Sequence, residues 1–280
     1  MPTSFGKIYL KIADFYIQIE FNKTLSKYNK TRIVRQITSD YKGFIFPLKP
    51  SRIDYTVEFV EHELIHAFHK QRTKYYINYY YIECKNKITT FYYISRLELG
   101  FILKDILTQL LANNQGIVLH SSANLIDNKA TLFIGEKGSG KSTIMVYLHN
   151  KYKALANDTI FLRHKNKSVL FYQTPFYEKE WRVHRDNKAH QLGRIYFIRK
   201  AQYFRIEKIT NKNRILSLCI KHTVPNGKNI RSNEIKTLIK IASSFNDFYY
   251  FYFDKNKNNL LQFLCKVRGT TLTEEKIKVY

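Results

Sequence analysis

A short glycine-rich stretch has the residue types and the spacing that hold a phosphate chain. It fits the pattern G-x-x-x-x-G-K-S/T and consists of Gly135, Glu136, Lys137, Gly138, Ser139, Gly140, Lys141, Ser142 and Thr143. In such a loop the glycines let backbone N–H groups curl around phosphate oxygens, and the N-terminus of the following helix adds a favourable dipole. Lys141 would reach the β and γ phosphates, Ser142 would place its hydroxyl on Mg²⁺, and Thr143 would begin the helix that fixes the loop. The stretch therefore predicts binding of a nucleoside triphosphate.

The residues on either side of this stretch agree with the prediction. Residues 130–134 form a short apolar run rich in β-forming types, and residues 144–148 continue as an apolar helix. Strand, loop and helix in this order are the context that the phosphate-binding pattern requires. A Gly/Ser turn with an accidental lysine is the alternative, and these flanks disfavour it.

Two polar side chains elsewhere could complete the chemistry. Residues 116–126 predict a pair of strands that contains His120, and residues 154–158 predict an apolar strand that ends at Asp158. A carboxylate in that place can face the phosphates and hold Mg²⁺ or accept a proton. Asp158 could equally be a turn residue, and His120 could equally be a packed structural histidine. The pattern alone leaves both alternatives open.

A second motif, His62-Glu63-Leu64-Ile65-His66, spells the H-E-x-x-H signature of zinc proteases and is followed by His69. Zinc chemistry requires a helix here, so that both histidines share one face beside the glutamate base. A strand pattern directly precedes the motif, tyrosine-rich β sequence follows it, and no helix for a third ligand is evident downstream. We therefore favour a chance match over a zinc site.

The basic character of the chain bears on its partners. A formal net charge of +25 is large enough to attract any polyanion. The lysines are scattered, which fits either a functional basic surface or a compositional bias. A tyrosine run among basic residues could stack nucleic-acid bases, but no RNA-binding fingerprint accompanies it, so sheet packing is the favoured use of Tyr75, Tyr76, Tyr79, Tyr80 and Tyr81. Nucleic acid is not the expected partner.

Length and composition indicate a folded protein. The chain has 280 residues, 44% of them hydrophobic, which is enough to bury a sizeable core. No apolar run reaches the length of a membrane span, and residues 1–20 lack the features of a secretion signal. Cys84, Cys219 and Cys265 are far apart and form no C-x-x-C pair, which suits a reducing compartment. These features predict a cytoplasmic protein without a membrane span.

The first part of the chain shows strand patterns. Apolar and polar residues alternate over 5–21 and again over 55–59. Residues 77–81 and 89–94 predict a hairpin that turns at 85–87. We expect a small, mostly antiparallel sheet.

A helical pattern separates this part from the rest. Residues 101–113 carry an apolar stripe and predict a helix at the seam. Beyond it, residues 232–245 predict an amphipathic helix and residues 248–253 an aromatic strand. We expect a β-rich domain over 1–114, ending in the bridging helix, and a second domain over 115–280.

Several segments of the second part resemble the kinase domain of HPr kinase/phosphorylase and of its relatives in peptide-modifying gene clusters, including lasso peptide kinases. They occur in the order of the family and comprise a histidine-bearing strand at 118–123, the phosphate loop at 138–143, a strand that precedes paired acids at 155–158, a T-P-F segment at 174–176 with Glu178, Glu180, Trp181 and Arg182 nearby, and a core strand at 191–198. The resemblance covers the second part and only weakly the first.

The resemblance implies a kinase that moves the γ-phosphate of ATP, with Mg²⁺, onto a hydroxyl of a peptide or protein. Asp158 would be the base or, with Ser142, a metal ligand, while Lys141 and His120 would lie at the phosphates. Asn157 departs from the family because it replaces the first of two acids, and this bears on the transfer step. Residue 143 is Thr where true HPr kinases have Glu, which points to the peptide-tailoring branch with serine as the acceptor.

The sequence thus predicts an α/β P-loop kinase domain of the HPr kinase type, preceded by a smaller, mostly antiparallel β domain. Arginines could clamp phosphate or an acidic substrate, or form a solvated basic face, at Arg182, Arg185 and Arg194. The alternative function is a catalytically weak nucleotide-binding module that recruits a peptide or nucleic acid, because Asn157 replaces an acid and the first part is basic and aromatic. The sequence does not decide whether the protein forms a homo-oligomer.

Overall fold

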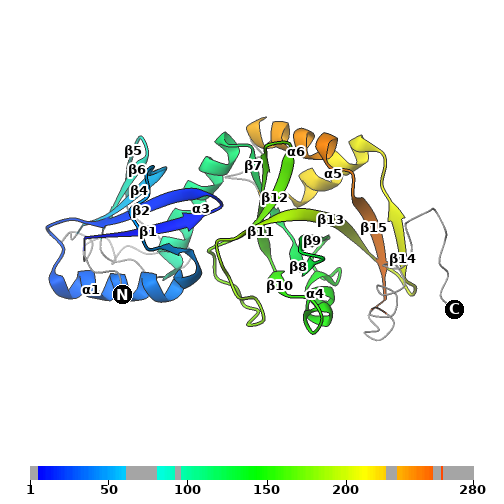
Figure 1. Ribbon diagram of the computed structural model, residues 1–280, viewed down its shortest axis with the longest axis horizontal. Helices are drawn as coiled ribbons and strands as arrows, with labels where there is room; N and C mark the ends of the chain where they lie inside the picture. The colour runs from blue at the N-terminus through cyan, green and yellow to red at the C-terminus, as the bar shows by residue number, and fades with distance from the viewer. Residues whose placement is uncertain (1–5, 61–80, 92–95, 225–231, 255–259, 261–280) are drawn as a thin grey trace, which may run out of the picture. The chain divides into compact units, whose positions relative to one another are not determined.

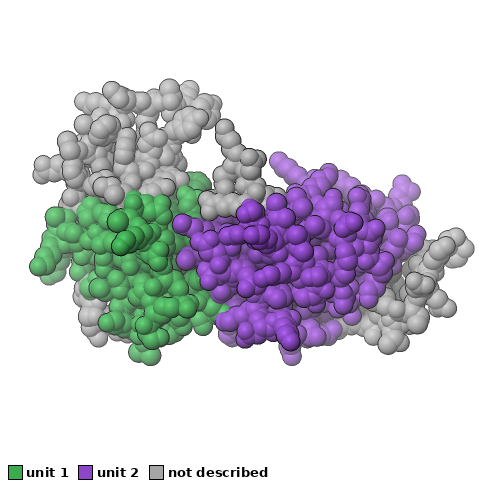
Figure 2. Space-filling model, turned by 90° about the horizontal axis from the view of Figure 1, so that it is seen from above, with its two compact units in different colours: residues 1–107, 175–177 green, residues 108–174, 178–280 purple. Residues whose placement is uncertain are grey.

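The computed structural model describes residues 6–60, 81–91, 96–224, 232–254 and 260. They fall into two compact units, which Figure 2 colours separately: Met1–Leu107 with Pro175–Tyr177, and Thr108–Thr174 with Glu178–Tyr280. The division falls inside helix α3 (Arg96–Asn113), the helix that the sequence predicts over 101–113. Each unit has its own sheet and core.

Unit 1 contains a six-stranded sheet in the order β3-β1-β2-β4-β6-β5. Its strands are β1 (Lys7–Ile12), β2 (Phe15–Phe21), β3 (Ile45–Phe46), β4 (Tyr55–Val60), β5 (Tyr81–Cys84) and β6 (Lys87–Phe91). Figure 1 labels its strands β1, β2, β4, β5 and β6. Apolar residues that alternate along the strands are buried: Leu10, Ile12, Ile17, Ile19, Tyr55, Val57 and Phe59. The alternation over 5–21 and 55–59 therefore predicted these strands for the right reason, since side chains of a strand point to opposite faces.

Most strand pairs in unit 1 are antiparallel, as the sequence predicts, but the sheet also contains two parallel pairs that were not predicted. β1 pairs with β2 and β3, and β5 with β6, in antiparallel fashion, whereas β2–β4 and β4–β6 are parallel. Parallel neighbours need a crossover connection, and helix α1 (Lys27–Asp40) lies between β2 and β4 in the chain. The sequence patterns did not reveal α1. Unit 1 is therefore mixed α/β.

Three predictions for the first part concern residues 62–94, of which the structure describes only 81–91. A hairpin is present as β5 and β6, but its described first strand overlaps the predicted strand 77–81 only at Tyr81, since residues 77–80 lie outside the described part. The turn includes Lys85 with a positive φ of 52°. The H-E-x-x-H motif at 62–66, His69 and the tyrosines from Tyr75 to Tyr80 lie outside the described residues.

Unit 2 contains a nine-stranded sheet in the order β10-β8-β9-β13-β12-β11-β7, to which β15 and β14 are added beside β13. Its strands are β7 (Gly116–His120), β8 (Ser122–Ile126), β9 (Lys129–Ile134), β10 (Ala154–Ala156), β11 (Thr159–Lys165), β12 (Ser168–Gln173), β13 (Ala189–Lys200), β14 (Arg205–Lys208) and β15 (Phe248–Phe253). The predicted strands at 116–126, 130–134 and 248–253 are all present. The sequence also predicted an apolar strand before Asp158, and β10 lies there.

The long strand β13 joins two parts of this sheet. Its first residues pair with β12 in antiparallel fashion, and its later residues pair with β9 and β15 in parallel. The register against β9 shifts between Leu192 and Arg194, which leaves Gly193 as an extra, bulged residue. Leu192, Ile195 and Phe197 belong to one hydrophobic core cluster as a result.

Three helices cover this sheet. Helix α4 (Lys141–His149) packs Ile144 and Leu148 with Phe133 of β9. Helices α5 (Lys212–His222) and α6 (Ser232–Ser244) pack in the other large core cluster, which contains Leu132 of β9. Adjacent residues of β9 thus bury their side chains in different clusters, as alternation along a strand requires. Among the described residues, no helix has both the length and the apolarity that crossing a membrane demands.

Candidate functional site

The glycine-rich stretch forms the connection between β9 and α4. β9 ends at Ile134 and α4 begins at Lys141, with Gly140 as its N-cap in a left-handed conformation (φ 106°). Gly140 has no side chain that could cap the helix, so the first N–H groups of α4 are available to an anion. The loop also closes on itself, because the Ser139 N–H donates to the carbonyl of Glu136 at 3.1 Å. A Cβ on Gly135 would lie 2.6 Å from the Ser139 hydroxyl, so this close approach requires glycine.

The Lys141 ammonium lies over this loop. Its Nζ donates to the carbonyl oxygens of Gly135 at 2.7 Å and Glu136 at 3.0 Å. Burial lowers the pKa of Lys141, and the negative charge of Asp158 opposes that shift. The positive charge of Lys141 is therefore held at the mouth of the loop, where the sequence predicted a phosphate contact.

Strand β8 fixes the start of α4 with buried polar side chains. The Ser122 hydroxyl donates to the carbonyl of Lys141 at 2.9 Å. One turn further, the Asn124 amide donates to the carbonyl of Met145 at 3.2 Å. Both residues are fully buried, so these hydrogen bonds rigidly tie the helix to the sheet. No local sequence pattern marks Ser122 or Asn124 for this role.

His120 and Asp158 form a pair beside the loop. β7 and β11 are antiparallel with Thr159 opposite His120, which brings Asp158, the residue before Thr159, next to the imidazole. His120 Nδ1 lies 3.3 Å from the Asp158 carbonyl oxygen and 3.4 Å from Asp158 Oδ1. The main chain reinforces this arrangement, because the Ser121 N–H donates to the same carbonyl at 3.0 Å. The structure therefore brings together the two residues that the sequence left as separate candidates.

The charges in this pair support each other. The hydrogen bond with Asp158 raises the pKa of His120 above its ordinary value, although burial opposes this. The hydrogen bond with His120 lowers the pKa of the Asp158 carboxyl, and the charge of Lys141 adds to that effect. The side chain of Asp158 is 77% exposed and that of His120 is 52% exposed. An ionised carboxylate thus faces solvent within electrostatic range of Lys141.

The turn that carries Asp158 is also held by a glutamate. The Asn157 N–H donates to Glu178 Oε2 at 3.1 Å. The side-chain oxygen of Asn157 is buried and has no hydrogen-bond partner within the described part of the chain. The position where the resemblance predicts a first acid therefore presents a neutral, inward-facing amide.

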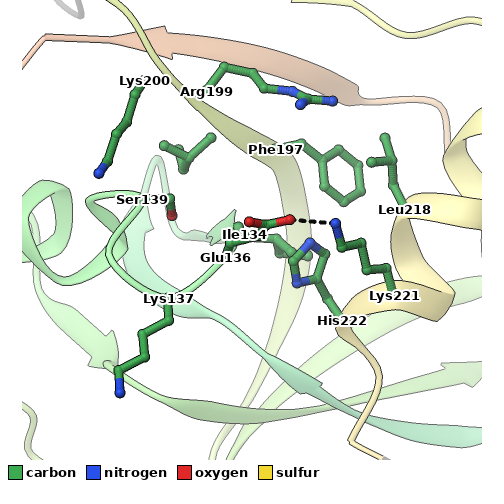
Figure 3. A pocket seen from close by; sticks show the side chains of 12 residues that line it. Ile134, Glu136, Lys137, Ser139, Phe197, Arg199, Lys200, Leu218, Lys221 and His222 are labelled. Carbon is green, nitrogen blue, oxygen red and sulfur yellow. Dashed lines mark hydrogen bonds and ion pairs between the residues drawn. The ribbon is translucent and has the colours of Figure 1, made fainter.

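A pocket of about 290 Å³ opens beside the loop (Figure 3). Its apolar lining comes from β9, β13 and α5 and includes Ile134, Phe197 and Leu218. Its polar and charged lining comes from the loop, the end of β13 and the end of α5: Glu136, Lys137, Ser139, Arg199, Lys200, Lys221 and His222. Glu136 and Lys221 point toward one another and form an ion pair. The pocket therefore combines an apolar wall with a basic rim.

The end of α5 reaches the pocket because it is attached to β7. Thr223 forms an antiparallel bridge with Leu119, and the Val224 N–H donates to the Val118 carbonyl at 2.9 Å. This places His222 beside the glycine-rich loop. Burial, together with the nearby charges of Lys141 and Lys221, lowers the pKa of His222 to about 4, so the imidazole is neutral at pH 7. Lys221 and His222 belong to no sequence motif, so their position at the pocket is known only from the folded structure.

The side-chain oxygen atoms near the loop suit a Mg²⁺ ion that is also bound by the phosphates of a nucleotide. Ser142, in the first turn of α4, is exposed, and the Asp158 carboxylate is ionised. Mg²⁺ commonly uses one or two protein oxygens together with substrate phosphates. In the described ranges, no three His, Cys, Asp or Glu side chains gather into a protein-only metal site. Ser142 and Asp158 therefore offer the kind of oxygen ligands that such an ion uses.

Two of the arginines considered as clamps have other neighbours. Arg182 Nη1 donates to Glu180 Oε1 at 2.7 Å, and its guanidinium lies 4.6 Å from the centre of the Trp181 ring. Arg194, within β13, interacts with Tyr196. Arg194 therefore makes its contact along the strand, while Arg182 belongs to the segment between β12 and β13.

Comparisons with known proteins add one finding. No family model and no curated protein matches the chain. Among solved structures, the Hpr(Ser) kinase/phosphatase from Coxiella burnetii is similar with a TM-score of 0.32 and 15% sequence identity, over 54% of this chain and 88% of that chain. So low a TM-score does not decide the activity of this chain.

Proposed function

We propose that this protein is an ATP-dependent kinase that transfers the γ-phosphoryl group to a hydroxyl, most simply a serine hydroxyl of a peptide or protein. The observation that carries the proposal is the convergence of Lys141, His120 and Asp158 at one glycine-rich loop. A cation, a second titratable cation and an ionised carboxylate are the groups that phosphoryl transfer uses for positioning and charge neutralisation. The resemblance described above supports the same activity and suggests the tailoring of peptide natural products.

The pocket beside the loop would hold the nucleoside half of ATP. Its volume of about 290 Å³ is close to the lower range of small-molecule sites. Phe197 and Leu218 offer apolar contact to a base, and the loop lies next to them. The phosphate chain would then run over the loop toward Lys141 and the N-terminus of α4.

The transfer step would use the exposed Asp158 carboxylate. The acceptor oxygen forms a bond to the γ-phosphorus while the bond from that phosphorus to the bridging oxygen of ADP breaks. The hydroxyl proton passes to Asp158, and His120, whose pKa is raised, stabilises the carboxylate before it accepts the proton. Lys141 neutralises charge on the phosphate oxygens. When bound, Mg²⁺ supplies further charge neutralisation, and Ser142 and Asp158 are the residues that would hold it.

Measurement of phosphate transfer from ATP to candidate serine peptides tests this proposal. We expect wild-type protein to transfer phosphate and both Lys141→Ala and Asp158→Ala to lose at least about a hundredfold in kcat/KM, since each removes a charge at the reacting groups. Lys151→Ala, on an exposed lysine after α4, serves as a charge-matched control. Transfer that survives both site substitutions would contradict the proposal.

A second candidate function is nucleotide binding without transfer. Asn157 favours it, because a neutral amide stands where the resemblance predicts an acid. In that case calorimetry would show ATP binding that Lys141→Ala removes, and no tested acceptor would be phosphorylated. Gain of transfer on Asn157→Asp would then identify the missing acid as the cause.

A further inference from the structure

The segment between β12 and β13 is fastened to the turn that carries Asp158. Glu178 Oε2 accepts from the Asn157 N–H at 3.1 Å, and Glu178 Oε1 accepts from the Glu180 N–H at 3.0 Å. At the end of β12, Gln173 donates to the carbonyl of Leu155 in β10. Residues 178–182, hereafter the acceptor loop, are therefore held beside residue 158 by hydrogen bonds on both sides of Lys179.

Lys179 is left without a carboxylate partner among the described residues, although two glutamates flank it. The carboxylate of Glu178 is occupied by main-chain N–H groups, and that of Glu180 pairs with Arg182 at 2.7 Å. Lys179 is exposed. The pKa of Asp158 is lowered chiefly by its hydrogen bond with His120, and the charges of Lys141 and Lys179 add to this effect. An uncompensated cation therefore lies within electrostatic range of the candidate base.

The same loop exposes the only tryptophan of the chain. Trp181 is 72% exposed, and the guanidinium of Arg182 lies 4.6 Å from its ring centre. The imidazole of His149, at the end of α4, contacts the ring edge with a centroid distance of 6.5 Å. Large aromatic side chains presented in a fixed orientation are typical of surfaces that bind a partner chain.

We propose that the acceptor loop binds the peptide that carries the accepting hydroxyl, with Lys179 selecting an acidic residue next to that hydroxyl and Trp181 contacting an apolar residue beyond it. The inference rests on the proposed kinase function. An acceptor hydroxyl must approach the Asp158 carboxylate, so the neighbouring residue of the peptide passes within reach of the Lys179 ammonium. Opposite charges across such a contact increase affinity and set the register of the peptide.

Matched peptides test this inference. They carry one serine followed by Glu, Gln or Lys, and kcat/KM for phosphate transfer is measured with wild-type, Lys179→Ala and Lys179→Glu proteins. We expect wild-type protein to favour Glu over Gln by about fivefold, as for an exposed ion pair, with the difference in KM rather than kcat. Lys179→Ala should remove the preference, and Lys179→Glu should favour the Lys peptide. Lys188→Glu, an equal charge change at an exposed site of the same segment, should retain the wild-type preference.

The outcomes separate the inference from the function on which it rests. Transfer without any charge preference, or a preference that Lys179→Glu leaves unchanged, overturns the role of Lys179 while the kinase function stands. Weaker ATP binding in Lys179→Glu, measured by calorimetry, would assign the residue to the nucleotide and would also overturn the inference. Absence of transfer to every peptide by wild-type protein overturns both proposals.

Discussion

At the scale of single residues, the site depends on how neighbouring charges set protonation. His120 and Asp158 stabilise each other's charged forms, whereas His222 is held neutral by burial and by two nearby lysines. Two histidines near one loop thus differ in charge at about pH 6, where His120 is cationic and His222 is neutral. A cationic His120 favours phosphate, and a neutral His222 can donate or accept a hydrogen bond.

The charge of His120 leads to a pH prediction. Because its pKa is raised, the imidazolium and its contribution to stability and to phosphate binding are fully present below about pH 6.5 and are lost as the pH rises through the raised value. We expect ATP affinity to fall about threefold across that rise, a modest change because the group is half exposed. Calorimetry over a pH series checks this, with His120→Gln expected to show no such step.

Two variants serve as controls for the pH series. Asp158→Asn removes the cause of the raised pKa, so the step should move to lower pH. His164→Gln, in β11 and away from the glycine-rich loop, should leave the step in place. An unchanged step in His120→Gln would show that another group titrates.

At the scale of elements, the start of α4 combines a left-handed backbone with a close steric contact. Gly140 has a φ of 106°, and a Cβ there would lie 2.9 Å from the ring of Phe253 in β15. Gly138 also has a positive φ, of 77°, but a Cβ there would meet open space. A comparison of variants at the two glycines therefore separates the energetic cost of backbone strain from the cost of a steric clash.

This comparison gives a second prediction. Gly138→Ala should destabilise the protein by about 1 kcal/mol through strain alone, and Gly140→Ala by about 2–4 kcal/mol because Phe253 must also move. Thermal unfolding and ATP titration of both variants measure the difference. Equal losses in the two variants would mean that the Phe253 contact does not constrain the loop.

Elements and site residues differed in how far the sequence predicted them. The glycine-rich loop, β9 and α4 were predictable because the signal is local, and apolar periodicity identified α3 and α6. Helix α1 escaped because it buries only Ile33 and Ile37 and so lacks a strong apolar stripe. Because α1 was not predicted, the sequence pattern showed no crossover connection, and the parallel pairing of β2 with β4 was not expected.

The assembled site depends on pairings that no local pattern encodes. Asp158 meets His120 because Thr159 pairs with His120 across β11 and β7. His222 reaches the loop because Thr223 pairs with Leu119. Such register is decided by packing of whole strands, so the sequence supplied candidates but not their contacts.

At the scale of the whole molecule, the two compact units each have a separate buried core. All residues of the candidate site belong to unit 2. In unit 1, several carboxylates pair with lysines on the sheet, including Glu20 and Glu58 with Lys87. The net charge of +25 already counts such paired carboxylates, so all of it acts on anionic ligands over long range.

The location of the site in unit 2 predicts a regional response to ATP. Ligand binding stabilises the state that binds it, so saturating ATP should slow hydrogen exchange in β9 and α4. Exchange in β1 and β2 of unit 1 should change little. Hydrogen-exchange mass spectrometry measures both regions in one sample, and Lys141→Ala serves as the control without protection. Equal protection of both regions would contradict the prediction.

The bulge in β13 has a consequence for how the chain tolerates change. Because Gly193 is an extra residue, Leu192 on one side of it and Ile195 and Phe197 on the other share one core. Loss of this single glycine would place Leu192 and Ile195 two positions apart, which keeps both side chains on the buried face, so the deletion would remove the bulge and leave buried and exposed positions as they are. A one-residue deletion elsewhere in β13 would instead act as a shift of reading frame within the folded strand, exchanging buried and exposed positions on one side of it.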